Sequence, residues 1–146
     1  MSTLSQDANC LWTTDLTVGC SALDLRNAHM LDLLAGTASV ISASEGAELA
    51  EWLDACYDQF EVLLSEEERE LATVGYPELS LHQRLHGYAR SIIHDARRQL
   101  QRAPTSPALA ALASQSCAAL ALWLPRHIVE ADRMFLPYVD SRFRGG

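Results

Sequence analysis

Residues 82–100 read HQRLHGYARSIIHDARRQL, and the spacing of side chains in this segment indicates the fold class. Its apolar side chains and two of its histidines recur at alternating steps of four and three residues, the spacing that keeps side chains on one face of an α-helix. The positions concerned are His82, His86, Ala89, Ile93, Ala96 and Leu100. We therefore predict a helix whose inward face is mostly apolar and begins with two histidines.

Three other stretches of the chain show the same spacing. Their inward positions are Leu23, Asn27, Met30, Leu34, Thr37 and Ile41; Leu49, Cys56, Phe60, Leu63, Glu67 and Leu71; and Leu109, Ala113, Ser116, Leu120, Trp123 and His127. The expected helices cover residues 21–42, 44–74, 77–102 and 107–130. Glycine and proline mark short connections between them, which make neighbouring helices antiparallel. The fold class is therefore all-α, an antiparallel up-down four-helix bundle.

The remaining segments are assigned around this bundle. We expect an N-terminal arm over residues 1–20 and a C-terminal segment over residues 131–146, so that residues 1–146 form one domain. Ser42 followed by Glu45 resembles a capping box, the hydrogen-bonded pair that starts a helix. Ser106-Pro107 places a capping residue before a first-turn proline.

The amino-acid composition argues against two classes of binding partner. The chain of 146 residues has 19 acidic side chains and a net charge of −8, without a basic cluster. Such a balance repels phosphate backbones and anionic lipids, so nucleic acid and membranes are not expected partners. The start of the sequence lacks the charged and apolar regions of a signal peptide, and we expect a cytoplasmic protein. The sequence identifies no protein partner.

Several inward side chains of the predicted helices are metal-ligand types. His82 and His86 are four residues apart, so both imidazoles project from one helical face and can bind one ion. Glu67 and His127 occupy inward positions on two other helices, where an unpaired polar group is costly to bury. A bound cation would compensate these groups together.

Asp132 is the fifth candidate ligand. It follows His127 by five residues, and on a continuous helix this step turns it roughly 140° away. The helix must therefore bend or end between them if both bind one ion. The alternative is that Asp132 is surface charge and Glu67 belongs to the solvated run Glu66-Glu67-Glu68-Arg69-Glu70.

Several motifs make the chain resemble the hemerythrin family, specifically its single-domain bacterial members. They are Trp12, Val18-Gly19, Leu23-Asp24, Glu67-Glu68, Gly75-Tyr76-Pro77, His82-x-x-x-His86, Trp123-Leu124-x-x-His127-Ile128 and Asp132-x-x-Phe135-x-Pro137-Tyr138. The resemblance implies a four-helix bundle that holds non-haem iron. It implies that Glu67 and Asp132 are the bridging carboxylates, and that His82, His86 and His127 hold the more fully coordinated iron.

The chain departs from the family pattern at the second iron. The family has histidines where this sequence has Asn27 and Leu63, and these two residues are poor or impossible iron ligands. His29 does not replace the first of them, because it lies about 200° from Asn27 on a helix. His94 follows the inward Ile93 and is expected to be exposed. The second metal is therefore expected to be weak or absent.

These observations favour a metal-binding protein over an enzyme. The donor set of three imidazoles and two carboxylates suits one Fe(II), with Zn(II) or Mn(II) possible. The expected role is oxygen, nitric oxide or redox sensing, because reversible oxygen carriage in this family draws one electron from each of two irons. A dinuclear oxygen-binding protein, an iron enzyme that processes peroxide or oxygen, and an interaction module without metal stay open as alternatives.

Overall fold

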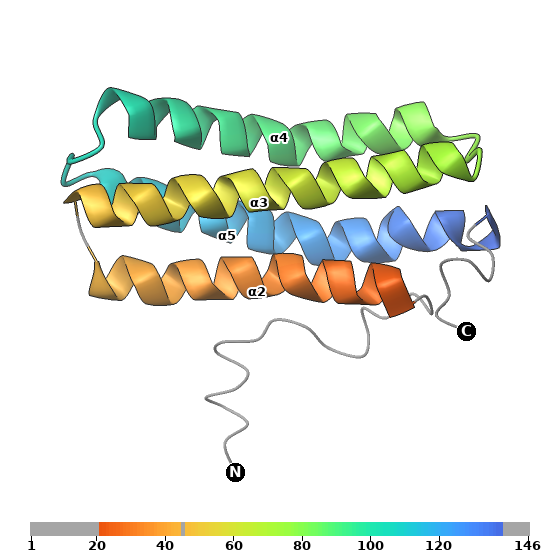
Figure 1. Ribbon diagram of the computed structural model, residues 1–146, viewed down its shortest axis with the longest axis horizontal. Helices are drawn as coiled ribbons and strands as arrows, with labels where there is room; N and C mark the ends of the chain where they lie inside the picture. Colours follow the sequence, from red (N-terminus) through yellow and green to blue (C-terminus); the bar gives the residue numbers. More distant parts are fainter. Residues whose placement is uncertain (1–20, 45, 139–146) are drawn as a thin grey trace, which may run out of the picture.

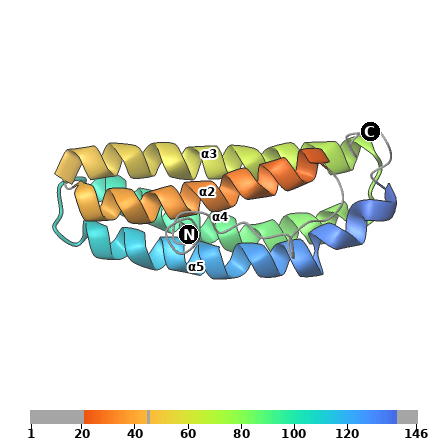
Figure 2. The ribbon, with the colours of Figure 1, turned by 90° about the horizontal axis from the view of Figure 1, so that it is seen from below.

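The computed structural model describes residues 21–44 and 46–138, which form four long α-helices and one 3₁₀ helix. The helices are α2 (Ser21–Ala43), α3 (Gly46–Thr73), α4 (Leu79–Arg102) and α5 (Leu109–Glu130), followed by η2 (Asp132–Tyr138). The N-terminal arm expected for residues 1–20 lies outside the described residues. The four helices run up and down in one bundle, with α2 and α4 each packed against α3 and α5 (Figures 1 and 2). The predicted fold class is confirmed.

Most of the predicted inward positions lie in the core of the bundle, whereas Ile41 and Trp123 are only partly buried. Leu49, Phe60, Ile93 and Leu120 are all at most 1% exposed. Burial of each such side chain stabilises the fold by roughly 1.5–3 kcal/mol, which makes this stripe the main source of stability. No described helix is long and apolar enough to cross a lipid bilayer.

The connection between α3 and α4 is a Schellman turn. The Tyr76 N–H donates to the Leu71 carbonyl at 3.0 Å and the Gly75 N–H donates to the Ala72 carbonyl at 3.1 Å. Gly75 has φ +71°, a left-handed conformation that glycine adopts without steric cost. This turn places Tyr76, only 8% exposed, against Phe135 of η2.

Both predicted caps are wrong. Ser42 does not start α3; it lies in the last turn of α2, where its hydroxyl donates to the Ala38 carbonyl. Ser44 precedes α3 instead, and its hydroxyl donates to Glu48 at 3.1 Å. The two serines are two residues apart, and α2 ends at Ala43, one residue beyond its predicted end. Ser106 accepts the Ala108 N–H, but α5 begins at Leu109 with Ala108 as its N-cap, so Pro107 lies before the helix and not in its first turn.

Candidate metal centre

Five side chains from four elements converge at the end of the bundle where α2 and α4 begin. Glu67 comes from α3, His82 and His86 from α4, His127 from α5 and Asp132 from η2. Each is at most 6% exposed. Because α5 ends at Glu130 and the chain continues as a 3₁₀ helix, Asp132 turns back toward His127. The bend expected between these two residues is therefore present.

The donor atoms of these residues lie close together. Glu67 Oε1 is 2.7 Å from His82 Nε2, 3.1 Å from His86 Nε2 and 4.0 Å from His127 Nε2. Asp132 Oδ1 is 3.3 Å from His82 Nε2 and 3.0 Å from His127 Nε2. The Nε2 atoms of His86 and His127 are 3.1 Å apart. One ligand atom from each of Glu67 and the three histidines lies within 4.8 Å of the others.

Six of these separations resemble those in an octahedral coordination shell. With metal–ligand bonds of about 2.1 Å, adjacent donors are about 3.0 Å apart and opposite donors about 4.2 Å. Five of the separations above are near the value for adjacent donors. The separation between Glu67 and His127 is near the value for opposite donors. Asp132 Oδ1 is buried and lies 3.3 Å from His82 Nε2 and 3.0 Å from His127 Nε2, but neither contact has good hydrogen-bond geometry. A cation between these atoms would satisfy that oxygen.

A second carboxylate fixes the orientation of His86. Its Nδ1 is 2.6 Å from Glu68 Oε2, and the same oxygen accepts a hydrogen bond from Arg90 at 2.6 Å. With Nδ1 as the donor to Glu68, His86 Nε2 keeps its lone pair for a cation. Burial opposes the Glu68 charge, but the contacts with His86 and Arg90 lower the pKa of Glu68. Helical spacing in the sequence does not indicate this role for Glu68 or Arg90.

We predict that Glu68→Gln weakens metal binding by roughly 10- to 100-fold, the usual effect of removing a carboxylate behind a ligand histidine. The glutamine oxygen can still accept the Nδ1–H bond, but the negative charge that increases the basicity of the ring is lost. Competition with a fluorescent chelator measures the affinity. The control is Glu51→Gln, which removes the same charge from an exposed position of α3 and leaves the affinity unchanged.

Aromatic side chains surround the histidine rings. The indole of Trp123 stacks on the ring of His127, with centroids 4.4 Å apart and planes 19° apart. Phe135 lies 5.6 Å from the ring of His82, and Tyr76 packs against both. These contacts fix ring orientations and limit the access of water to the cluster.

The two carboxylates change the pKa values of the histidines. Burial opposes a charged ring, but the nearby Asp132 and Glu67 carboxylates raise the pKa of both His82 and His127 to about 9. Burial also opposes the charge of Glu67, yet the three histidines hold its pKa well below the usual range. Without metal, the buried charges therefore compensate one another.

Metal binding should therefore release protons. At pH 7 both rings carry a proton in the metal-free chain, and coordination through Nε2 requires its removal. We predict release of about two protons per ion near pH 7, falling to about one near pH 9 and to none only well above it, and an affinity that rises with pH over the same range. Calorimetry in buffers with different ionisation enthalpies measures this number. Release that does not vary between pH 7 and pH 10 would contradict the charged pair.

The positions expected for a second iron contain other groups. Asn27 is fully buried and its amide donates to Asp132 Oδ2 at 3.3 Å, while Leu63 lies in the apolar core. Arg26, the residue before Asn27, forms a 2.6 Å ion pair with Glu70. Burial opposes the Arg26 charge, but Glu70 and then Glu67 raise its pKa. A permanent cation near Glu67 disfavours a second metal ion there.

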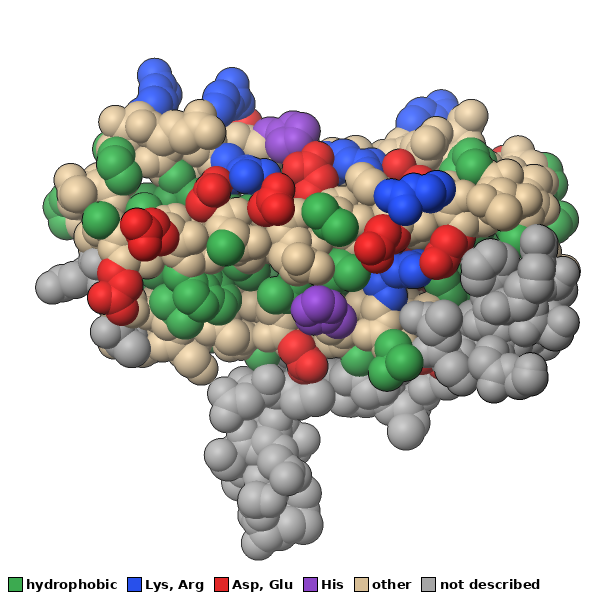
Figure 3. All heavy atoms as spheres, in the orientation of Figure 1, with side chains coloured by type: hydrophobic (Ala, Val, Ile, Leu, Met, Phe, Trp, Pro, Cys, Tyr) green, Lys and Arg blue, Asp and Glu red, His purple; other side chains and the backbone are tan. Residues whose placement is uncertain are grey.

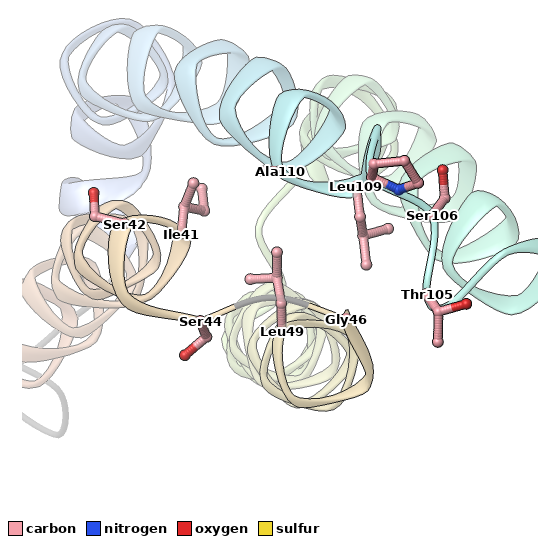
Figure 4. Close-up of a pocket in the computed structure, with 10 residues that line it drawn as sticks. Ile41, Ser42, Ser44, Gly46, Leu49, Thr105, Ser106, Leu109 and Ala110 are labelled. Carbon is pink, nitrogen blue, oxygen red and sulfur yellow. The ribbon is translucent and has the colours of Figure 1, made fainter.

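The other two histidines are exposed, as predicted. His29 lies on the outer face of α2, and His94 is 58% exposed and 3.1 Å from Glu61. At the opposite end of the bundle, a hollow of about 600 Å³ lies between the α2–α3 and α4–α5 connections (Figure 4). The described residues that line it offer hydroxyls and apolar groups but no imidazole or carboxylate. Among the described residues, the one cluster of possible metal ligands lies at the other end of the bundle.

Most of the chain matches the model of a known protein family. The family model described as the hemerythrin HHE cation binding domain matches residues 19–139. Neither the search of curated proteins nor the search of solved structures found a matching protein. The matched range contains every residue of the candidate centre.

Proposed function

Because the chain belongs to the hemerythrin family of cation-binding domains, we propose that it holds one transition-metal ion, with ferrous iron as the first candidate. The ligands in this proposal are Glu67, His82, His86, His127 and Asp132. The observation that carries it is the convergence of three Nε2 atoms and two carboxylate oxygens at separations that suit one coordination shell.

The kind of metal follows from the donor set. Three imidazole nitrogens and two carboxylate oxygens suit Fe(II) or Mn(II), which accept six ligands of mixed nitrogen and oxygen type. Zn(II) prefers four ligands and would leave one carboxylate without a partner in a buried site. Zinc is therefore the weaker candidate.

Occupation by one ion rather than two is supported by the neighbouring residues. The Asn27 amide occupies Asp132 Oδ2, the oxygen that a second ion would need, and Leu63 supplies no donor. Arg26 already supplies a positive charge on the same side of Glu67. The role we propose is the sensing of oxygen, nitric oxide or redox state, rather than oxygen delivery that draws electrons from two irons.

When bound, ferrous iron would supply an electron-donating centre with a coordination position for a diatomic ligand. The chain contributes the surroundings. Trp123, Tyr76 and Phe135 give the cluster aromatic walls, and Glu68 with Arg90 fixes the orientation of His86. These features favour a small uncharged ligand over an anion.

The proposal is tested by loading the protein with ferrous iron without oxygen and titrating it with nitric oxide. We expect an absorbance change that saturates at one nitric oxide per iron and is absent when the chain holds zinc. Iron that binds but gives no change with nitric oxide would contradict the sensing role. Two irons per chain with reversible oxygen binding would instead establish the dinuclear alternative.

A further inference from the structure

The surface between α4 and α5 carries an unusual concentration of exposed apolar side chains. Of the nine large exposed hydrophobic residues in the described part of the chain, five line two hollows on this surface. They are Leu81, Leu85, Tyr88, Leu122 and Met134. Leu81, Leu85 and Tyr88 follow the i, i+4, i+7 pattern of a helix stripe that packs on a partner. We call this surface the α4–α5 face.

The two hollows carry opposite charge. The first, of about 350 Å³, is lined by Leu81, Leu85 and Met134 together with the carboxylates of Glu78 and Glu130. The second, of about 430 Å³, is lined by Tyr88, Leu122, Trp123 and a single charged group, Arg126. One end of the face is therefore acidic and the other basic.

These charges lack ion-pair partners within the described chain. None of the ion pairs among residues 21–44 and 46–138 involves Glu78, Arg126 or Glu130. The opposite side of α4 differs, because Arg90 and Arg97 pair there with acidic residues of α3. That side shows acidic and basic side chains interspersed (Figure 3). The α4–α5 face is thus left with apolar groups and separated unpaired charges.

We propose that the α4–α5 face binds a second copy of this chain in an antiparallel, two-fold symmetric dimer. A two-fold axis between Leu81 and Leu85 places Leu81 of each copy against Leu85 of the other. The same two-fold axis relates positions 78 and 88, so Tyr88 of one copy faces the hollow of the other copy that contains Glu78. On α5 the same axis places Arg126 of one copy against Glu130 of the other copy. Each apolar or charged group therefore meets a complementary one.

The hollows provide room for this arrangement. Tyr88 is 55% exposed and projects from the face, whereas the acidic hollow of about 350 Å³ is open to receive a side chain. His82 lines that hollow and Trp123 lines the other. A second copy bound here would therefore lie against residues that contact the candidate metal centre.

Sedimentation velocity on the full-length protein tests the proposal. The expected species has twice the chain mass of 16.1 kDa at micromolar concentration. Leu85→Glu should give a monomer, and Leu25→Glu should stay dimeric because Leu25 is an equally apolar, 72% exposed position on α2. Circular dichroism verifies that both variants are folded. A wild-type protein that is monomeric over the whole micromolar range, or a Leu85→Glu variant that is folded and still dimeric, overturns the proposal.

Charge exchange tests the symmetry itself. Arg126→Glu alone, or Glu130→Arg alone, places like charges opposite each other and should weaken the dimer by about tenfold or more. The double variant Arg126→Glu with Glu130→Arg restores opposite charges across the two-fold axis and should recover most of the affinity. A double variant as weak as the single variants overturns the antiparallel arrangement. These outcomes do not depend on metal, so they are separate from the test of the proposed function.

Discussion

Replacement of His86 by alanine will abolish stable metal binding and lower the melting temperature of the metal-loaded protein by about 10 °C. His86 is fully buried, and its two ring nitrogens link Glu67 and His127 on one side with Glu68 on the other. A ligand present at 1,000 times its dissociation constant stabilises the folded state by about 4 kcal/mol. For a domain of this size, 1 kcal/mol corresponds to roughly 2–4 °C.

The measurement is a thermal melt with and without a chelator. The wild-type protein should lose the same 10 °C when the metal is removed, whereas the His86→Ala variant should not respond to the chelator. His94→Ala is the matched control, since it removes an exposed histidine from the same helix. A wild-type protein whose melting temperature is unchanged by the chelator would favour an interaction module without metal.

The double variant Asn27→His with Leu63→His will bind two metal ions per chain instead of one. Both positions are buried next to the cluster, and Asn27 already contacts Asp132. The imidazoles add two strong donors on the side where the present chain offers an amide and a hydrocarbon. Without metal, a histidine in place of the buried Leu63 should cost on the order of 1–3 kcal/mol, and this loss should be recovered when metal is added.

The single variants serve as controls for this prediction. Each supplies only one new donor, so each should bind the second ion at least tenfold more weakly than the double variant. If the double variant still holds one ion, the missing imidazoles are not what limits the site. The Arg26–Glu70 ion pair would then be the remaining obstacle, and Arg26→Met would be the next variant to measure.

The fold was predictable because burial follows helical phase. The positions selected from spacing alone include Leu49, Ile93 and Leu120, which are all almost inaccessible to solvent. Helix ends were less certain, because several serines near a boundary can cap a helix and spacing does not distinguish Ser42 from Ser44. The position of Asp132 required the helix to end after His127, and the break at Glu130 allows it.

The proposed metal ligands could also be predicted from the sequence, since Glu67 and the three histidines interrupt mostly apolar helix stripes. The residues that hydrogen-bond to these ligands and orient them could not be predicted. Glu68 is one of several glutamates in an acidic run, and helical phase does not predict how far a long side chain reaches across an interface. Only the packing of α3 on α4 brings Glu68 between His86 and Arg90. The available signals were the Glu67-Glu68 motif and the four-residue spacing of His86 and Arg90.

The number of metal ions per folded chain tests whether these five side chains hold a single ion. The protein is purified without added metal, incubated with excess ferrous iron in the absence of oxygen, desalted and analysed by mass spectrometry for metal and by absorbance for protein. The proposed site predicts a value near one that falls to zero in the His86→Ala variant. A value near two, or a value near zero in the wild-type protein, would contradict a single ion held by these five side chains.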